Sequence, residues 1–190
     1  MSAYLIVGLG NPDKEYNETR HNVGFMFLDA LAKQMKASDF VLEKKLLAEI
    51  ATGKVNGQKV ILAKPQTYVN KSGEAVKKIV QNSKFKIQNL VIIHDDLDVP
   101  FEHTKLTPGS GSGGHKGVQS ILSQLKTENI KRLKIGIANN KLKLARSQKS
   151  DKKRLEMISG LVLSKFTPSE REKLKKIFKE AIAKIEQMIY

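Results

Sequence analysis

Short apolar runs that alternate with stretches of helical periodicity constrain the fold of this chain more than any other feature. The runs are rich in Val, Ile and Leu and are bounded by Gly, Pro or Asn, which is typical of strands. They are Tyr4 to Val7, Leu47 to Thr52, Lys59 to Ala63, Leu90 to His94 and Leu133 to Ile137. Several lack polar alternation, as expected for strands buried on both faces of a parallel sheet.

Helical patterns lie between and after these runs. Apolar residues share one helix face in Val23 to Met35, Gly73 to Asn82 and Gly117 to Leu125. The order Thr167-Pro168-Ser169-Glu170 predicts a capping box that starts a last helix. The polar, basic stretch from Asn139 to Arg154 favours a mobile loop or a short helix over one sheet edge. We therefore predict an α/β fold over residues 1–190, a single-domain three-layer sandwich whose twisted mixed, largely parallel sheet is flanked by helices.

The charge balance indicates a polyanionic partner. The chain has 34 Lys and Arg against 19 Asp and Glu in 190 residues, a formal net charge of +15. Such basic domains attract phosphate backbones, although the excess of lysine over arginine also fits a bias toward solubility. The absence of cysteine excludes disulfides, thiolate nucleophiles and Cys-ligated zinc. With no signal peptide pattern and no membrane-spanning run, we expect a cytoplasmic protein without membrane contact.

Polar side chains cluster after the predicted strands and at the predicted helix starts. The clusters are Asn11 to His21, Pro65 to Asn70, His94 to Asp98 and Gly113 to Lys116. Parallel strands end at the same edge of a sheet, so these segments are expected to converge on one cleft.

His21 is the candidate general base, because an imidazole titrates near neutral pH. His94 and His115 compete for this role, and His103 has the setting of an ordinary loop residue. Asp95 can orient a catalytic histidine by accepting its second N–H, or it can simply cap a turn.

Other motifs fit different chemistries less well. The cluster His94 to Asp98 resembles the metal ligands of a phosphoesterase, but neighbouring strand residues point to opposite faces. Gly8 to Gly10 hints at a dinucleotide fingerprint, yet Pro12 and Asp13 stand where that motif would continue. The glycines before His115 form either a phosphate cradle or a flexible connector. We predict neither a metal nor a cofactor.

Two aromatic and two amide side chains in the polar turns can contact a substrate. Tyr16 and Tyr68 are suited to stacking on a base, a ribose or a peptide, or they cover the edge of the core. Asn11 and Asn70 can donate and accept hydrogen bonds, or each can cap a turn.

Taken together, these segments resemble the bacterial-type peptidyl-tRNA hydrolase family over most of the chain. The blocks that carry the resemblance are Val7 to Pro12, Tyr16, Thr19 to Gly24, Pro65 to Gly73, His94 to Asp98, Gly113 to Gly117 and Arg132 to Gly136. The resemblance implies a monomeric cytoplasmic enzyme, independent of metal, that cleaves the ester between a peptide and the 3′ end of tRNA. Its partner is then peptidyl-tRNA.

The resemblance also implies roles for individual residues. His21 activates water, Asp95 supports the basic form of His21, and Asn11 completes the catalytic group. The implied contacts with substrate or tRNA are made by Tyr16, Tyr68, Asn70, Lys105, His115, Lys116 and Lys134.

This chain departs from the family pattern at several positions. Lys116 stands where an asparagine is usual, and we hypothesise that it substitutes as an electrostatic donor. Asp13 stands where glycine is frequent, and Val69 replaces a methionine. Thr107 lies near a position that often carries a tRNA-binding lysine. Lys105 then compensates for that lysine.

Two other functions remain open from the sequence. A non-catalytic relative would keep the basic surface for RNA binding. The presence of four residues favours an enzyme instead: His21, Asp95, Asn11 and Asn70. A nuclease that uses Asp95, Asp96 and Asp98 to bind metal would lose its activity in EDTA.

Overall fold

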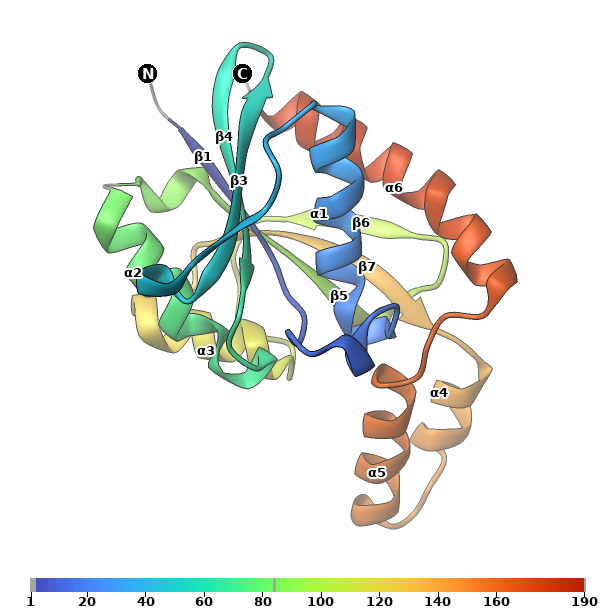
Figure 1. Ribbon diagram of the computed structural model, residues 1–190. Helices are drawn as coiled ribbons and strands as arrows, with labels where there is room; N and C mark the ends of the chain where they lie inside the picture. Colours follow the sequence, from blue (N-terminus) through green and yellow to red (C-terminus); the bar gives the residue numbers. More distant parts are fainter. Residues whose placement is uncertain (1–2, 84, 190) are drawn as a thin grey trace.

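A seven-stranded sheet forms the centre of the computed structural model, which describes residues 3–83 and 85–189 (Figure 1). The strands are β1 (Tyr4–Gly8), β2 (Val41–Glu43), β3 (Ala48–Val55), β4 (Gln58–Pro65), β5 (Leu90–Pro100), β6 (Thr104–Thr107) and β7 (Lys131–Ala138). The α-helices are α1 (Val23–Gln34), α2 (Ser72–Ser83), α3 (Lys116–Leu125), α4 (Asn140–Arg146), α5 (Asp151–Val162) and α6 (Pro168–Met188). Short 3-10 turns are η1 (Lys14–Tyr16), η2 (Arg20–Asn22), η3 (Lys44–Leu46), η4 (Val69–Lys71) and η5 (Ile87–Asn89).

The strand order is β2-β3-β4-β1-β5-β7-β6. The central strands β4, β1, β5 and β7 are parallel to one another. The outer strands β2, β3 and β6 pair in antiparallel fashion. The predicted α/β class with a mixed, largely parallel sheet is therefore confirmed.

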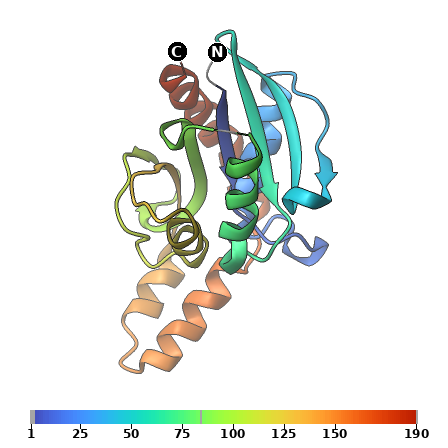
Figure 2. The same ribbon diagram turned by 90° about the vertical axis from the view of Figure 1, so that its left-hand side faces the viewer.

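Helices cover both faces of the sheet. Successive strand residues point to opposite sides, and in the central strands the residues on both sides are apolar and buried. On one face, Ile6 and Ile93 pack under α1 and α6, where the Phe27 and Phe178 rings meet edge to face at 5.7 Å. On the other face, Leu5 and Ile92 pack under α2 and α3. Helices α4 and α5 extend together beyond one end of the body (Figure 2).

The last helix begins as the sequence predicts. Thr167 accepts from the Glu170 N–H, and the Glu170 carboxylate accepts from the Thr167 N–H. This reciprocal capping box satisfies two amides that the helix itself leaves unpaired. In the part of the chain that the structure describes, no helix is both long and apolar enough to cross a membrane.

Two predictions about the elements were wrong. The strand expected to end at His94 continues to Pro100, because Asp95 and Asp96 still pair with β7. The stretch from Asn139 to Arg154 is neither a loop nor one short helix. It forms α4 and the first turn of α5, which pack against each other.

Candidate active site

The candidate site lies where β1, β4 and β5 approach the starts of α1 and α3. Gly24 in the first turn of α1 is essential to this packing. A Cβ at Gly24 would lie 2.5 Å from the Leu9 nitrogen and 2.6 Å from the Ile93 oxygen. The close approach brings η2, which precedes α1, to the carboxyl end of the sheet. His21 of η2 thereby reaches Asp95 of β5.

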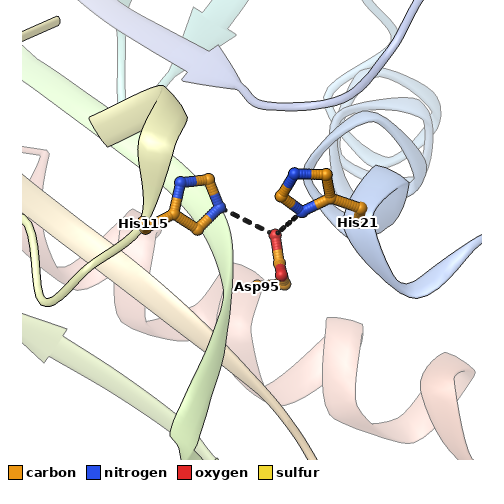
Figure 3. Close-up of side chains that lie close together, drawn as sticks. All are labelled: His21, Asp95 and His115. Atoms are coloured by element: carbon orange, nitrogen blue, oxygen red, sulfur yellow. Dashed lines mark hydrogen bonds and ion pairs between the residues drawn. The ribbon is translucent and has the colours of Figure 1, made fainter. Parts of the chain in front are cut away.

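Two imidazoles share one carboxylate oxygen at this point (Figure 3). His21 Nδ1 and His115 Nε2 each lie 2.9 Å from Asp95 Oδ1. The Asp95 side chain is 3% exposed, so water competes little for these hydrogen bonds. The contact with Asp95 uses Nδ1 of His21 and leaves Nε2 as the nitrogen that can accept a proton.

The electrostatics of the site favour a charged Asp95 and a basic His21. Burial raises the pKa of Asp95, but the two histidines outweigh it and hold that pKa well below the ordinary value. Burial lowers the pKa of His21, Asp95 raises it, and Lys116 opposes the increase. The net effect is a raised pKa for His21. His21 is thus a stronger base than a free imidazole.

Asn11 follows β1 with a fixed side-chain orientation. Its Oδ1 accepts from the Val69 N–H at 3.0 Å, so its Nδ2 is the group that can donate to a substrate. Asn22 holds the Asn11 backbone from both sides. Asn22 Oδ1 accepts from the Asn11 N–H, and Asn22 Nδ2 donates to the Asn11 carbonyl, each at 2.9 Å. Asn11 therefore presents a donor on a rigid backbone.

A cleft of about 370 Å³ opens beside His21. Its lining is formed by Asn11, His21, Tyr68, Val69, Asn70, Lys71 and Lys116. Lys116 is the first residue of α3 and also borders a neighbouring hollow together with Asn70. The hydroxyl of the exposed Tyr68 donates to Asp13 Oδ2 at 2.8 Å. Asp13, which stands where the family often has glycine, therefore holds Tyr68 in place.

Some predicted site residues lie outside this lining. Tyr16 ends η1 and is partly buried. Lys105 of β6 pairs directly with Lys134 of β7 in the antiparallel register. The Lys134 ammonium forms a 2.8 Å ion pair with Asp96. These two lysines lie on neighbouring strands, apart from the residues that line the cleft.

Of the three proposed metal-binding acids, Asp95 contacts His21 and His115, and the other two do not join it in one cluster. Asp96 pairs with Lys134 and accepts from the N–H groups of Asp98 and Val99. Asp98 forms an ion pair with Arg146. Each carboxylate therefore has its own partner, which does not support the nuclease alternative.

His94 is also unsuited to the role of base. It is 1% exposed, its Nδ1 lies 2.6 Å from the Asp95 carbonyl, and burial lowers its pKa to about 3. Its ring packs edge to face on His115 at 4.8 Å. His94 thus forms the floor beneath His115.

His21, Asp95 and His115 are residue types that bind metals, and their donor atoms lie within 4.8 Å of one another. However, His115 Nδ1 accepts from the Gly117 and Val118 N–H groups. A neutral His115 then carries its proton on Nε2 and has no lone pair there for a metal. The donor set does not fit a metal ion.

Arg20 positions the histidine turn and was assigned no role from the sequence. Its Nη2 contacts both carboxylate oxygens of Glu170 at 2.8 and 2.7 Å, and its guanidinium lies 4.8 Å from the Phe166 ring centre. The pair links η2 to the start of α6. A signal was present in the sequence, since Arg20 adjoins His21 and Glu170 belongs to the capping box.

Comparisons with known proteins agree with this geometry. The family model described as Peptidyl-tRNA hydrolase matches residues 5–190. The peptidyl-tRNA hydrolase of Aquifex aeolicus is 40% identical over 182 residues, which cover 96% of this chain and 88% of that protein. That of Carboxydothermus hydrogenoformans is 42% identical over 178 residues, which cover 94% and 87%.

A solved structure agrees as well. The crystal structure of peptidyl-tRNA hydrolase from Acinetobacter baumannii matches with a TM-score of 0.85 at 32% identity, covering 98% of this chain and 88% of that one. The family model and the relatives both span nearly the whole sequence. This chain therefore belongs to the peptidyl-tRNA hydrolase family.

Proposed function

We propose that this protein hydrolyses the ester bond between the peptide and the 3′ end of tRNA in peptidyl-tRNA, with His21 as the general base. Family membership supports the reaction. The observation that carries the role of His21 is its 2.9 Å contact with Asp95, which leaves Nε2 available beside the cleft. A base held in one tautomer by a buried carboxylate is suited to removing a proton from water.

The reaction then proceeds without a covalent enzyme intermediate. His21 Nε2 takes a proton from water while the water oxygen attacks the ester carbonyl carbon. The negative charge that forms on the carbonyl oxygen is met by N–H donors. The bond to the ribose oxygen breaks, and the proton passes from His21 to this oxygen. The products are free tRNA and the peptide carboxylic acid, which releases its remaining proton to water and becomes a carboxylate.

The residues around the cleft have separate tasks in this proposal. Asn11 Nδ2 donates to the developing oxyanion, since its oxygen already accepts from Val69. Asn70 and Lys116 border the neighbouring hollow and hold the peptide side of the substrate. Tyr68 stacks on the 3′ end of the tRNA, with Tyr16 as the next aromatic group along the chain.

The net charge of +15 supports binding of the tRNA backbone. In this proposal Lys105 and Lys134 contribute to that binding, and the protein acts as a cytoplasmic monomer that does not contact membranes. Raising the salt concentration should then raise KM for tRNA substrates with little change in kcat. The oligomeric state is tested by light scattering of the purified protein at micromolar concentration, which gives its molecular mass.

The proposed function is tested by incubating the purified protein with an N-acylated aminoacyl-tRNA in EDTA. The expected products are the free N-acyl amino acid and full-length tRNA. Shortened RNA that forms only without EDTA would instead identify a metal-dependent nuclease. Binding of tRNA with no release of the acyl amino acid would identify a non-catalytic RNA-binding protein.

A further inference from the structure

His115 lies at the start of α3 and caps this helix with its ring. Gly113 and Gly114 precede it with φ angles of 60° and 80°, a left-handed turn that directs the chain into the helix. His115 Nδ1 lies 3.1 Å from the Gly117 nitrogen and 3.3 Å from the Val118 nitrogen. These two amides are donors, so Nδ1 must be the acceptor.

The helix thereby decides which nitrogen of His115 carries the proton. With Nδ1 occupied as an acceptor, the neutral ring carries its hydrogen on Nε2. Nε2 lies 2.9 Å from Asp95 Oδ1, and the His115 side chain is 9% exposed. A proton added to Nδ1 would face two N–H groups and break the cap. His115 therefore offers Asp95 a donor whose tautomer is fixed by the backbone of α3.

The same carboxylate oxygen serves the proposed base. His21 donates to Asp95 Oδ1 from the other side, and the two imidazole ring centres are 5.1 Å apart (Figure 3). A carboxylate oxygen that already accepts one N–H is a weaker hydrogen-bond acceptor for a second N–H donor. The strength of the contact between His21 and Asp95 is therefore set in part by His115.

We propose that His115 is a positioning residue: it holds Asp95 Oδ1 toward His21 and limits how strongly Asp95 stabilises the protonated form of His21. Both ring nitrogens of His115 are engaged inside the protein, so it acts through Asp95 instead of contacting the substrate. Without this second donor, His21 would hold its proton up to a higher pH and fewer molecules would contain a free base. This inference rests on the proposed role of His21.

Other groups that face His21 must be considered in any pH measurement. Asp95 comes from β5, Lys116 from the start of α3, and Tyr68 and Lys71 line the cleft around η4. His94 packs behind His115 and is neutral at the pH of the assays. A substitution at His115 removes none of these titratable groups.

Two substitutions separate the two functions of the ring. His115→Asn places an amide oxygen near the position of Nδ1 and keeps a good helix cap, but it is too short to reach Asp95. His115→Gln places an N–H near the position of Nε2 and keeps the donor, but it caps the helix poorly. The exposed His103 offers a matched control, His103→Asn.

The test is the pH dependence of kcat/KM together with the NMR titration of His21 in the free protein. We expect His115→Asn to move the acidic limb and the His21 titration upward by about one pH unit, with a melting temperature near that of the wild type. We expect His115→Gln to lower the melting temperature and leave the His21 titration near its wild-type position. A His21 titration unchanged in His115→Asn would overturn the proposal.

A measurement on the unmodified protein is independent of whether the variants fold. The ¹⁵N shifts of the His115 ring should show a protonated Nε2 and an unprotonated Nδ1. The opposite tautomer would contradict the inference. The tautomer and the His21 titration are read without substrate, so the inference can fail while the proposed function holds. Failure of the proposed function would appear separately, as no release of the acyl amino acid by the wild-type protein. Failure of the role of His21 would appear as a His21→Ala variant with full activity.

Discussion

His21 Nδ1 and Asp95 Oδ1 meet at 2.9 Å and join the turn before α1 to the interior of β5. The two residues are 74 positions apart in the sequence, so the contact exists only in the folded protein. It fixes the His21 tautomer and places Nε2 beside the cleft. The orientation of the proposed base therefore depends on the packing of α1 against the sheet.

The first prediction concerns pH. His21 must be neutral to act as a base, and its pKa is raised above the ordinary 6.5. Activity should therefore fall on acidification through a pKa higher than 6.5, measured as kcat/KM between pH 5 and 9. The stability of the fold depends on pH in the opposite direction to activity. The His21–Asp95 contact contributes fully below pH 6.5, and this contribution is lost as the pH rises through the folded-state value.

Asp95→Asn is the second prediction. The introduced amide keeps an oxygen for the N–H donors of His21 and His115, but it has no negative charge to stabilise the protonated His21 that forms when water is deprotonated. We expect kcat/KM to fall by about 10²- to 10⁴-fold, with circular dichroism unchanged. A loss of less than tenfold would show that the charge of Asp95 contributes little to the basicity of His21.

The third prediction concerns the proposed oxyanion donor. Asn11→Asp keeps an oxygen for the Val69 N–H but replaces the Nδ2 donor with a second acceptor. We expect kcat to fall by about 10²- to 10³-fold while the melting temperature changes little. Asn22→Leu is the matched test of rigidity. It removes both contacts to the Asn11 backbone and should lower stability as well as kcat.

A fourth prediction concerns the link between η2 and α6. The side chains of Arg20 and Glu170 are 5% and 18% exposed. Glu170→Ala should lower the free energy of unfolding by about 3 kcal/mol, because it leaves the Arg20 charge buried and removes half of the capping box. Urea unfolding measures this change. Glu172→Ala on the same helix removes an exposed pair with Lys175 and should have little effect.

The fifth prediction concerns Lys116. Its ammonium borders the cleft and opposes the increase in the pKa of His21. Lys116→Met should raise KM by about tenfold, as expected for the loss of one charge-assisted hydrogen bond, and move the acidic limb slightly upward. Lys116→Asn should recover part of the lost affinity. An increase in turnover by orders of magnitude in Lys116→Asn would refute the idea that the lysine replaces the usual asparagine.

The sequence predicted the central strands and the longer helices because their apolar residues repeat over many positions. The edge strand β2 could not be predicted in this way. Its residues Val41 to Glu43 are all exposed, and β2 forms because the chain pairs with β3. Strand β6 could not be predicted either, because its short run forms a strand by pairing with β7.

The sequence also predicted that the polar segments meet at one edge of the sheet. It did not show which histidine is the general base. His21, His94 and His115 have the same intrinsic chemistry. Burial separates His94, and the amides of α3 occupy Nδ1 of His115. The burial of His94 arises from packing between distant segments, which a local pattern does not encode. The His115 cap is local, with residues two and three positions ahead, but it requires α3 to begin at Lys116.

In the proposed reaction, His21 Nε2 removes a proton from the attacking water. This step is tested most directly by single-turnover cleavage of an N-acylated aminoacyl-tRNA by His21→Ala, with and without added imidazole. We expect a loss of about 10²- to 10⁴-fold and partial recovery with imidazole, increasing with the fraction of unprotonated imidazole. Cleavage by His21→Ala at the wild-type rate would contradict this step.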